Sequence, residues 1–330
     1  MRALITGGAG FIGYHLANEL LAHNYEVVLV DNFERGVKDY SIKELGQNDK
    51  VKILSLDLLK EESYEKIDGD FEIIFHLAAI IGVQNVLNRP AEVLKNNIIL
   101  LFNIVDFAKK QGHLKRIVFA STSEIYAGTL QHYDMEIPTP ESTPLTLTDL
   151  EHPRTSYMLS KIYGEAVLHQ SGLPFTIVRP HNFYGPRMGM SHVIPELLRK
   201  VWFNEGKGKL EVFSPYHKRT FCYISDAVVM IRLLAESPDS INQAYNIGNQ
   251  EPEICIKDLA EIIIRTLDKP YTICHGEIAP GSPERRCPNT HKTIECIGYI
   301  PQVSLEEGIQ KTFDWYKTHI FNDVQSGARY

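Results

Sequence analysis

The sequence predicts an α/β fold, in which a doubly wound parallel sheet is followed by a smaller mixed domain. Short β-branched runs alternate with longer helical patterns in the first half of the chain, as in a sheet covered by helices on both faces. A glycine-rich turn separates the first run from the first helical segment, a position typical of Rossmann-type sheets. After Arg179 the alternation weakens and prolines and glycines become frequent, which indicates a second, less regular domain.

The expected strands are short apolar runs. They are Arg2–Thr6, Glu26–Asp31, Val51–Ser55, Ile73–His76, Arg116–Ala120 and 176–179, with helical patterns at 10–23, 91–111 and 156–171. Later in the chain an alternating run at 219–224 precedes a helix at 226–236 and a short strand at 244–247. We therefore expect residues 1–179, with about 219–250, to form the first domain. Residues 180–218 and 251–330 are expected to form the second.

Composition excludes several classes of function. The chain has 330 residues, of which 44% are apolar and 23% charged, as in ordinary globular proteins. A net charge of −7 and the absence of any Lys/Arg run longer than a pair argue against nucleic acid as a partner. The five cysteines have neither disulfide-motif nor zinc-site spacing, so we expect reduced thiols and no metal. Apolar runs are too short to span a bilayer and no leader precedes the first strand, so we expect a cytoplasmic protein without a membrane partner.

The turn of sequence TGGAGFIG has the features of a dinucleotide site. Its Gly7, Gly10 and Gly13 let backbone N–H groups and a helix N-terminus approach a pyrophosphate. The second strand ends at Asp31, whose carboxylate can accept hydrogen bonds from both ribose hydroxyls. Because this charge repels a 2′-phosphate, we expect NAD rather than NADP. Asp57, after the third strand, is a further candidate contact to the adenine. The alternative is a plain turn with solvated acids.

Tyr157 and Lys161 are four residues apart and share one face of an expected helix. A tyrosine acts as a base near neutral pH when positive charge stabilises its phenolate, and a neighbouring ammonium provides such charge. Thr122, at the end of the fifth strand, can hold the substrate oxygen that Tyr157 deprotonates. An isolated pair of this kind is often only an exposed helical pair, but its place downstream of the glycine-rich turn favours a redox site.

These motifs together resemble the extended short-chain dehydrogenase/reductase family, in its branch of nucleotide-sugar epimerases, dehydratases and decarboxylases. The likeness covers nearly the whole chain and includes HLAA at 76–79, Asn97, Arg179-Pro180 and NFYGP at 182–186. It implies an NAD-binding first domain and a nucleotide-sugar-binding second domain, with a UDP-sugar favoured. It also implies oxidation of the sugar at C4, a second step on the 4-keto intermediate, and return of the hydride. The NAD contacts implied are Gly7, Gly10, Phe11, Ile12, Gly13, Asp31, Asn32, Asp57, Leu58, Leu77, Ala78, Ala79, Tyr157 and Lys161.

The segment Ser123-Glu124 bears on the second step. Dehydratases of this branch have Asp-Glu in this place, and epimerases have a small residue at the position of Glu124. The Ser-Glu pair resembles UDP-glucuronate decarboxylases, as do Pro153-Arg154, Gly185-Pro186-Arg187 and Arg286 shortly before Pro288. A ketone at C4 is β to the C6 carboxylate of a uronic acid, so oxidation there permits loss of carbon dioxide without a metal. Ser123, Glu124 and Arg286 are the candidates for this step.

Several alternatives stay open at this point. Glu124 can be a strand-end acid paired with an arginine, and Arg286 can simply bind the pyrophosphate or ribose. Ala127, the long loop 129–151 and the segments 188–192 and 204–209 depart from the decarboxylase pattern. The 4-epimerases and then the 4,6-dehydratases are therefore the next readings of the reaction. An NAD-sensing binding protein is the alternative without turnover; such proteins usually lose the tyrosine or the lysine.

The nucleotide end of the substrate needs fixed positive charge and N–H donors. By the resemblance, Arg219 contacts the phosphates, and Asn182, Arg187 and Arg286 are further substrate contacts. Phe213 fits a strand lining the base pocket, although a plain core aromatic is an equal alternative. The histidines His181, His192 and His217 are expected to be structural.

The two helices at 94–110 and 156–170 have apolar residues on more than one face. These residues include Ile98, Leu101, Val105 and Ile162. A helix that is apolar beyond one stripe needs a second packing partner. We therefore expect a homodimer in which both helices pair across a twofold axis, as is common in the family it resembles.

Overall fold

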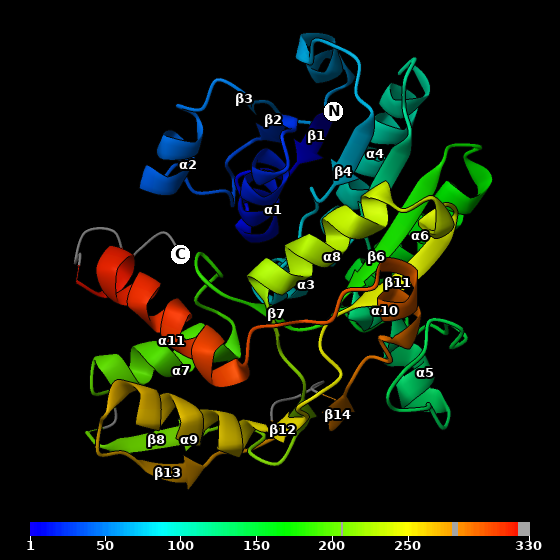
Figure 1. The fold of residues 1–330 in the computed structure, drawn as a ribbon. Helices are drawn as coiled ribbons and strands as arrows, with labels where there is room; N and C mark the ends of the chain where they lie inside the picture. The colour runs from blue at the N-terminus through cyan, green and yellow to red at the C-terminus, as the bar shows by residue number, and fades with distance from the viewer. Residues whose placement is uncertain (206, 279–282, 323–330) are drawn as a thin grey trace.

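The computed structural model describes residues 1–205, 207–278 and 283–322. A parallel sheet forms the centre of its larger part (Figure 1). In the described part of the chain, the seven strands stand in the order β11-β6-β5-β4-β1-β2-β3. They are β1 (Arg2–Thr6), β2 (Glu26–Asp31), β3 (Val51–Ser55), β4 (Ile73–His76), β5 (Arg116–Ala120), β6 (Phe175–Pro180) and β11 (Gln243–Ile247). All neighbours are parallel, so the expected doubly wound sheet is confirmed.

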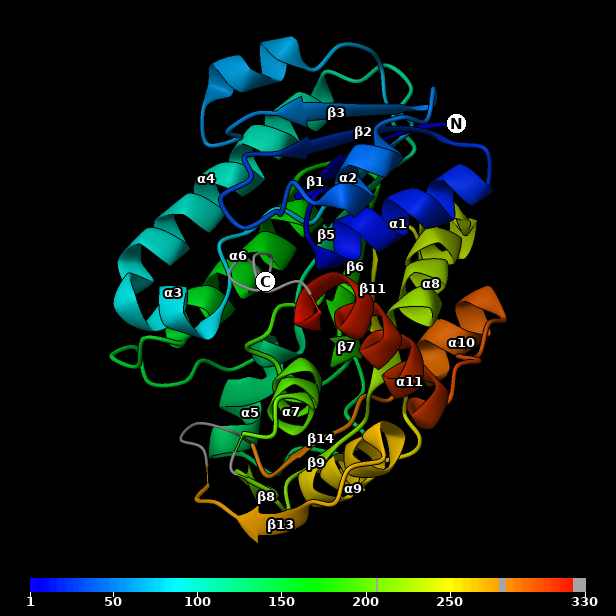
Figure 2. The same ribbon diagram turned by 90° about the vertical axis from the view of Figure 1, so that its left-hand side faces the viewer.

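Alternate residues of each strand enter two different hydrophobic cores. In β1, Ala3 and Ile5 belong to the core on one side of the sheet, and Leu4 belongs to the core on the other. Helices α1 (Phe11–Ala22) and α8 (Ile224–Glu236) pack together over the first core. Helices α4 (Pro90–Lys109) and α6 (Thr155–Gln170) pack together over the second (Figure 2). Because both faces are buried, the strands are continuous apolar runs.

Short helical segments lie between these elements or, in the case of η4, near the C-terminal end of the described chain. They are α2 (Tyr40–Leu45), η1 (Glu61–Lys66), α3 (Val83–Asn88), η2 (Ser123–Tyr126), α5 (Ala127–His132), η3 (Pro238–Ser240) and η4 (Lys317–Phe321). Among the helices of the described residues, none combines the length and the apolar character needed to cross a membrane.

In the residues that the structure describes, the second part of the molecule is built from three helices and small sheets. The helices α7 (Val193–Trp202), α9 (Ile256–Leu267) and α11 (Leu305–Tyr316) pack on one another. The small sheets pair β8 (Lys209–Val212) with β13 (Thr272–His275), and place β9 (Lys218–Arg219) between β12 (Ile254–Cys255) and β14 (Arg285–Arg286). A further pair joins β7 (Phe183–Tyr184) to β10 (Cys222–Tyr223).

Two features differ from the sequence expectation. The run 219–224 was expected as one strand, but its two ends belong to different sheets, β9 and β10, with the buried Thr220 and Phe221 between them. Helix α10 (His291–Ile297), expected in the second domain, packs against α8 and β11 of the first.

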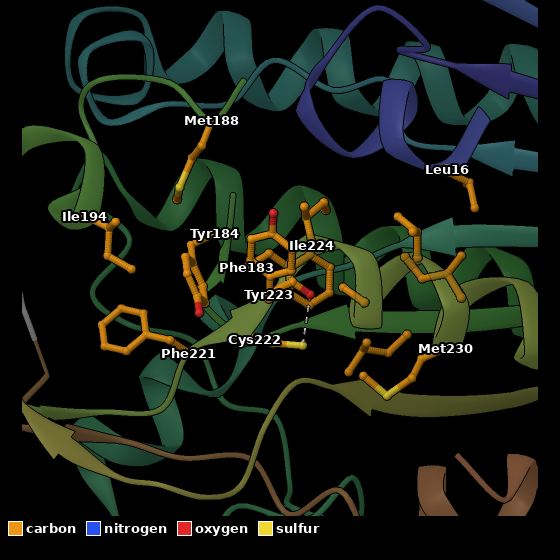
Figure 3. Packing of buried hydrophobic residues seen from close by; sticks show 14 of the residues in the cluster. Leu16, Phe183, Tyr184, Met188, Ile194, Phe221, Cys222, Tyr223, Ile224 and Met230 are labelled. Carbon is orange, nitrogen blue, oxygen red and sulfur yellow. Dashed lines mark hydrogen bonds between the residues drawn. The ribbon is translucent and has the colours of Figure 1, made fainter. Parts of the chain in front are cut away.

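A cluster of aromatic side chains joins the two parts. In Figure 3 the side chains of Phe183, Tyr184 and Tyr223 lie between Leu16 of α1 and Ile194 of α7. All five belong to one continuous hydrophobic core. The substrate-side segments are therefore packed directly onto the cofactor-side helices, and the site described next lies where these parts meet.

Candidate active site

The glycine-rich turn after β1 has the shape of an anion cradle. Gly7 has a φ of 69°, and a Cβ there would lie 2.9 Å from the backbone nitrogen of Ala78. A Cβ at Gly13 would lie 2.5 Å from the carbonyl oxygen of Gly7. No side chain caps α1 at Gly10, so the first N–H groups of the helix stay available to a ligand. The close packing at the two glycines and the uncapped start of α1 both fit a bound pyrophosphate.

Asp31 stands beside this turn at the end of β2. Its Oδ2 accepts a hydrogen bond from Ala9 N at 3.0 Å and its Oδ1 accepts one from Phe33 N at 2.8 Å. Burial raises the pKa of this carboxyl, and the two N–H donors act in the opposite direction. The fixed carboxylate at the turn fits an adenosine ribose and disfavours a 2′-phosphate, as expected for NAD.

The other expected cofactor residues lie around the same crevice. Leu77 and Ala78 follow β4, where Ala78 N donates to the Thr6 hydroxyl at 3.2 Å. The amide of Asn97 accepts from Ile80 N and donates to Ile80 O, which fixes the segment that follows. The residues Phe11, Ile12 and Ala79 are partly buried, Asp57 accepts from Leu59 N, and Asn32 is exposed. The side chain of Leu58 is buried in the core that α4 covers, so a cofactor contact at this residue would be made by its backbone.

Tyr157 and Lys161 meet above the end of β5. The ammonium of Lys161 donates to the carbonyl oxygen of Ala120 at 2.7 Å and lies 5.8 Å from the centre of the Tyr157 ring. Burial lowers the pKa of Lys161 to about 8. Burial and the charge of Glu124 raise the pKa of Tyr157, whereas its hydrogen bond with Thr122 lowers it. The tyrosine therefore depends on nearby donors and cations to act as a base.

Glu124 is held between two arginines that the chain supplies from distant segments. Its Oε1 accepts from Arg286 at 2.8 Å, and its Oε2 lies 3.6 Å from the guanidinium of Arg154. Attraction to Arg286 is the main reason that the pKa of Glu124 is lowered, so the group is a carboxylate at neutral pH. Thr122 caps η2 through the backbone N–H of Glu124, which places Ser123 and Glu124 beside Tyr157.

The expected substrate contacts separate into two groups. The guanidinium of Arg219 donates to the backbone carbonyls of residues 218, 283 and 284, and burial lowers its pKa to about 10. The backbone of Asn182 has a φ of 43°, and its amide donates to Thr220 O at 2.9 Å. Both lie with Arg286 on the second-domain side. Phe213 is 46% exposed, which fits a ligand surface better than a core position.

Arg187 lies on the other side of the site from the one expected. Its Nε donates to Asp39 at 2.8 Å, its Nη2 donates to Ala9 O at 3.3 Å, and its Cζ lies 4.4 Å from the centre of the Tyr14 ring. Its side chain is only 2% exposed. Arg187 thus attaches the segment after β7 to the glycine-rich turn, whereas the sequence suggested a substrate contact.

The histidines are placed as structural groups. His181 is buried, donates from Nε2 to Asn246 and has a pKa lowered to about 3 by burial, so it is neutral. Burial also lowers the pKa values of His192 and His217. In the described residues no cluster of His, Cys, Asp and Glu suits a metal ion.

Two features of the site were not predicted from the sequence. Glu165 binds Arg179 through two short hydrogen bonds, of 3.0 and 2.6 Å, behind Lys161. Arg35, in the loop after β2, lies near the phenol of Tyr157 and lowers its pKa. The sequence singled out Arg179 within Arg179-Pro180 but gave no sign of its partner Glu165, and Arg35 belongs to no motif recognised in the sequence.

Comparison with known proteins assigns the family. Residues 3–248 match the model of the NAD dependent epimerase/dehydratase family. The chain belongs to this family. As a member of the NAD-dependent epimerase/dehydratase family it uses NAD, and the cofactor predicted from Asp31 and the glycine-rich turn is confirmed.

Similar proteins extend over the whole chain. The chain is 33% identical to a UDP-N-acetyl-alpha-D-glucosaminuronate decarboxylase of Bacillus cytotoxicus, over 98% of this chain and 99% of that one. It is 30% identical to UDP-glucuronic acid decarboxylase 1 of Xenopus tropicalis, over 97% of this chain and 73% of that one. A UDP-glucuronic acid 4-epimerase of Bacillus cereus, solved with UDP-glucuronic acid and NAD, matches with a TM-score of 0.80 and 25% identity, covering 96% of this chain and 99% of that one. The expected nucleotide-sugar-modifying enzyme is confirmed.

Proposed function

We propose that the protein is a decarboxylase of a nucleotide-linked uronic acid, with a UDP-sugar as its substrate. The observation that supports this most directly is the carboxylate of Glu124 between Arg286 and Arg154, next to Tyr157. One acid between two guanidiniums leaves a surplus positive charge beside the redox tyrosine. A sugar whose C6 is a carboxylate complements this charge better than a neutral sugar does. The names of the decarboxylase relatives support the same assignment.

The first half of the reaction is oxidation at C4. Tyr157 takes the proton of the C4 hydroxyl, while the Thr122 hydroxyl holds the same oxygen. Lys161 stabilises the phenolate, because its ammonium is charged below about pH 8. NAD, when bound at the glycine-rich turn, would supply the hydride acceptor for this oxidation and the hydride donor for the final reduction.

The second half is loss of carbon dioxide from the 4-keto sugar. The bond between C5 and C6 breaks, and its electron pair moves toward the C4 carbonyl to give an enolate. Arg286 orients the leaving carboxylate. As Arg286 turns to the substrate carboxylate, Glu124 loses the attraction that keeps it ionised and can take up a proton from solvent. Ser123 holds the enolate oxygen, and Glu124 delivers this proton to C5. Hydride return to C4 then gives a nucleotide-linked pentose, or its 2-acetamido analogue, and carbon dioxide.

The ionisation of Glu124 argues against a dehydratase. Dehydration needs an acid that protonates the departing C6 hydroxyl. In this site Ser123 takes the place of that acid, and Arg286 keeps Glu124 ionised. The 4-epimerase is the second candidate, because a solved relative with UDP-glucuronic acid is an epimerase. Both reactions begin with the same oxidation, so only the product distinguishes them.

We further propose that the protein is a homodimer formed by α4 and α6. Leu101 and Val105, expected at this interface, are buried inside the monomer instead. The outer face of the pair nevertheless exposes Phe102 and Tyr163, 42% and 40% exposed, whose rings contact edge to face at 6.1 Å. An apolar patch of this kind favours a partner helix pair. We also propose the cytoplasm as its location, since all five cysteines are free thiols.

Mass spectrometry of the product tests the proposed reaction. The protein is incubated with UDP-glucuronate, UDP-N-acetylglucosaminuronate, UDP-glucose and UDP-N-acetylglucosamine. We expect loss of carbon dioxide from one or both uronates and no conversion of the neutral sugars. A Tyr157→Phe variant is the control and should leave all four unchanged. Loss of water from a neutral sugar, or a uronate of unchanged mass but altered C4 configuration, would contradict decarboxylation.

A further inference from the structure

The loop between β2 and α2, residues 32–39, folds back over the glycine-rich turn. A Cβ at Gly36 would lie 2.7 Å from Oδ1 of Asp31 and 2.8 Å from Cβ of Ala9, so the loop touches the turn at this residue. Asp31 holds the start of the loop through Phe33 N. Arg187 holds its end through Asp39 and the carbonyl oxygen of Val37. The loop is thus fixed at both ends across the cofactor crevice.

Arg35 lies at the middle of this loop and reaches the opposite wall of the crevice. A Cβ on Gly82 would lie 3.8 Å from Cζ of Arg35, so the guanidinium stands against the segment that follows β4. That segment borders the glycine-rich turn, because Gly7 is packed on Ala78. The guanidinium therefore spans the opening between the two segments that enclose a pyrophosphate. It is also within electrostatic range of Tyr157 and His192, deeper in the site.

No described residue forms a hydrogen bond or an ion pair with this guanidinium. Its sequence neighbour Glu34 pairs with Arg89 instead, at 3.3 Å. The nearby Arg187 is already bound to Asp39 and is almost fully buried. Among the described residues, Arg187 also keeps one guanidinium nitrogen, Nη1, without a hydrogen-bond partner, but that atom is buried, whereas Arg35 is exposed at the opening of the cradle. The pyrophosphate of a dinucleotide carries two negative charges at that place, and a planar guanidinium can bind it through two N–H groups.

We propose that Arg35 closes over bound NAD and pairs with its pyrophosphate, which slows release of the cofactor. The contact adds to the backbone N–H groups of the glycine-rich turn from the solvent side. This role concerns retention of the cofactor and is independent of the second step on the sugar.

Release of NAD from the purified holoprotein tests the proposal. Holoprotein is diluted into buffer with an NAD scavenger, and the NAD that remains bound is assayed over time after denaturation. Loss of one hydrogen bond to a charged group weakens binding of a ligand about tenfold to hundredfold. We therefore expect Arg35→Gln to release NAD about ten to a hundred times faster than the unaltered protein. Added salt should speed release from the unaltered protein and have little effect on the variant.

Lys38→Gln is the matched control. Lys38 is in the same loop and has the same charge, but its ammonium lies 4.3 Å from the centre of the Phe33 ring. This variant should retain NAD as the unaltered protein does. Thermal unfolding of the emptied proteins checks that both variants fold alike. Unaltered release from Arg35→Gln would overturn the proposal, as would equally fast release from both variants. Normal NAD retention with weakened binding of UDP would assign Arg35 to the sugar nucleotide and would overturn it as well.

Discussion

Replacing Glu124 by glutamine separates the oxidation of the sugar from the step that follows. The change keeps the size and hydrogen bonding of the side chain and removes its charge. The Glu124 and Arg286 side chains are 24% and 21% exposed, so losing this ion pair should lower the free energy of unfolding by only about 1 kcal/mol. Proton-transfer catalysis is worth about 10²- to 10⁴-fold, or about 3 to 5 kcal/mol of activation free energy. The catalytic effect should therefore exceed the effect on stability.

The expected signature of this variant is reduced cofactor without product. Tyr157 and Thr122 are retained, so a uronate substrate should still reduce bound NAD, and the absorbance of NADH should accumulate. Formation of the pentose product should be slowed about 10²- to 10⁴-fold. The charge of Glu124 raises the pKa of Tyr157, so its removal should lower that pKa. The acid limb of the pH profile for NAD reduction should consequently move to lower pH.

Stopped-flow absorbance and product analysis give the two rates separately. Glu253→Gln is the control, because Glu253 pairs with Arg285 at 2.7 Å, one residue from Arg286. This variant loses a comparable ion pair and should keep both rates. The reasoning would be refuted if Glu124→Gln turned over normally without accumulating NADH. It would also be refuted if the variant lost oxidation and decarboxylation to the same extent.

Three further outcomes are expected. The purified protein should release NAD and almost no NADP on denaturation, and Asp31→Ser should relax this preference for NAD. Chromatography of the released nucleotide measures both amounts, and a preparation of the unaltered protein rich in NADP would contradict the role of Asp31. The rate of NAD reduction should fall as pH rises above about 8, because Lys161 then loses the charge that stabilises the Tyr157 phenolate. A rate that stays unchanged up to pH 10 would exclude this role. Sedimentation at micromolar concentration should show a dimer. Phe102→Asp should convert it to monomers, because it places a charge beside Tyr163 at the interface. A monomeric unaltered protein would contradict the proposed interface.

Local patterns were sufficient to predict the sheet and the proximity of Tyr157 to Lys161. Strands such as β2 and β4 begin and end where the apolar runs do, because a strand buried on both faces must be apolar throughout. The glycine-rich turn and Asp31 were predictable because a tight turn at a strand end constrains neighbouring residues directly. The pairing of Tyr157 with Lys161 follows from the helical repeat, which brings residues four apart onto one face.

Only the tertiary structure could decide contacts between distant segments. The ion pair of Glu124 with Arg286 joins residues 162 positions apart, and no local spacing predicts it. Arg187 was expected as a substrate contact, but the packing of the segment after β7 turns its guanidinium toward Asp39 and Ala9. The division of 219–224 into β9 and β10 likewise depends on which strands β12 and β7 offer as partners. Local propensity selects a strand or a helix, whereas these contacts depend on how the elements pack together. The sequence by itself therefore determined the fold and the pairing of Tyr157 with Lys161. The tertiary structure decided which charged side chains lie around that pair.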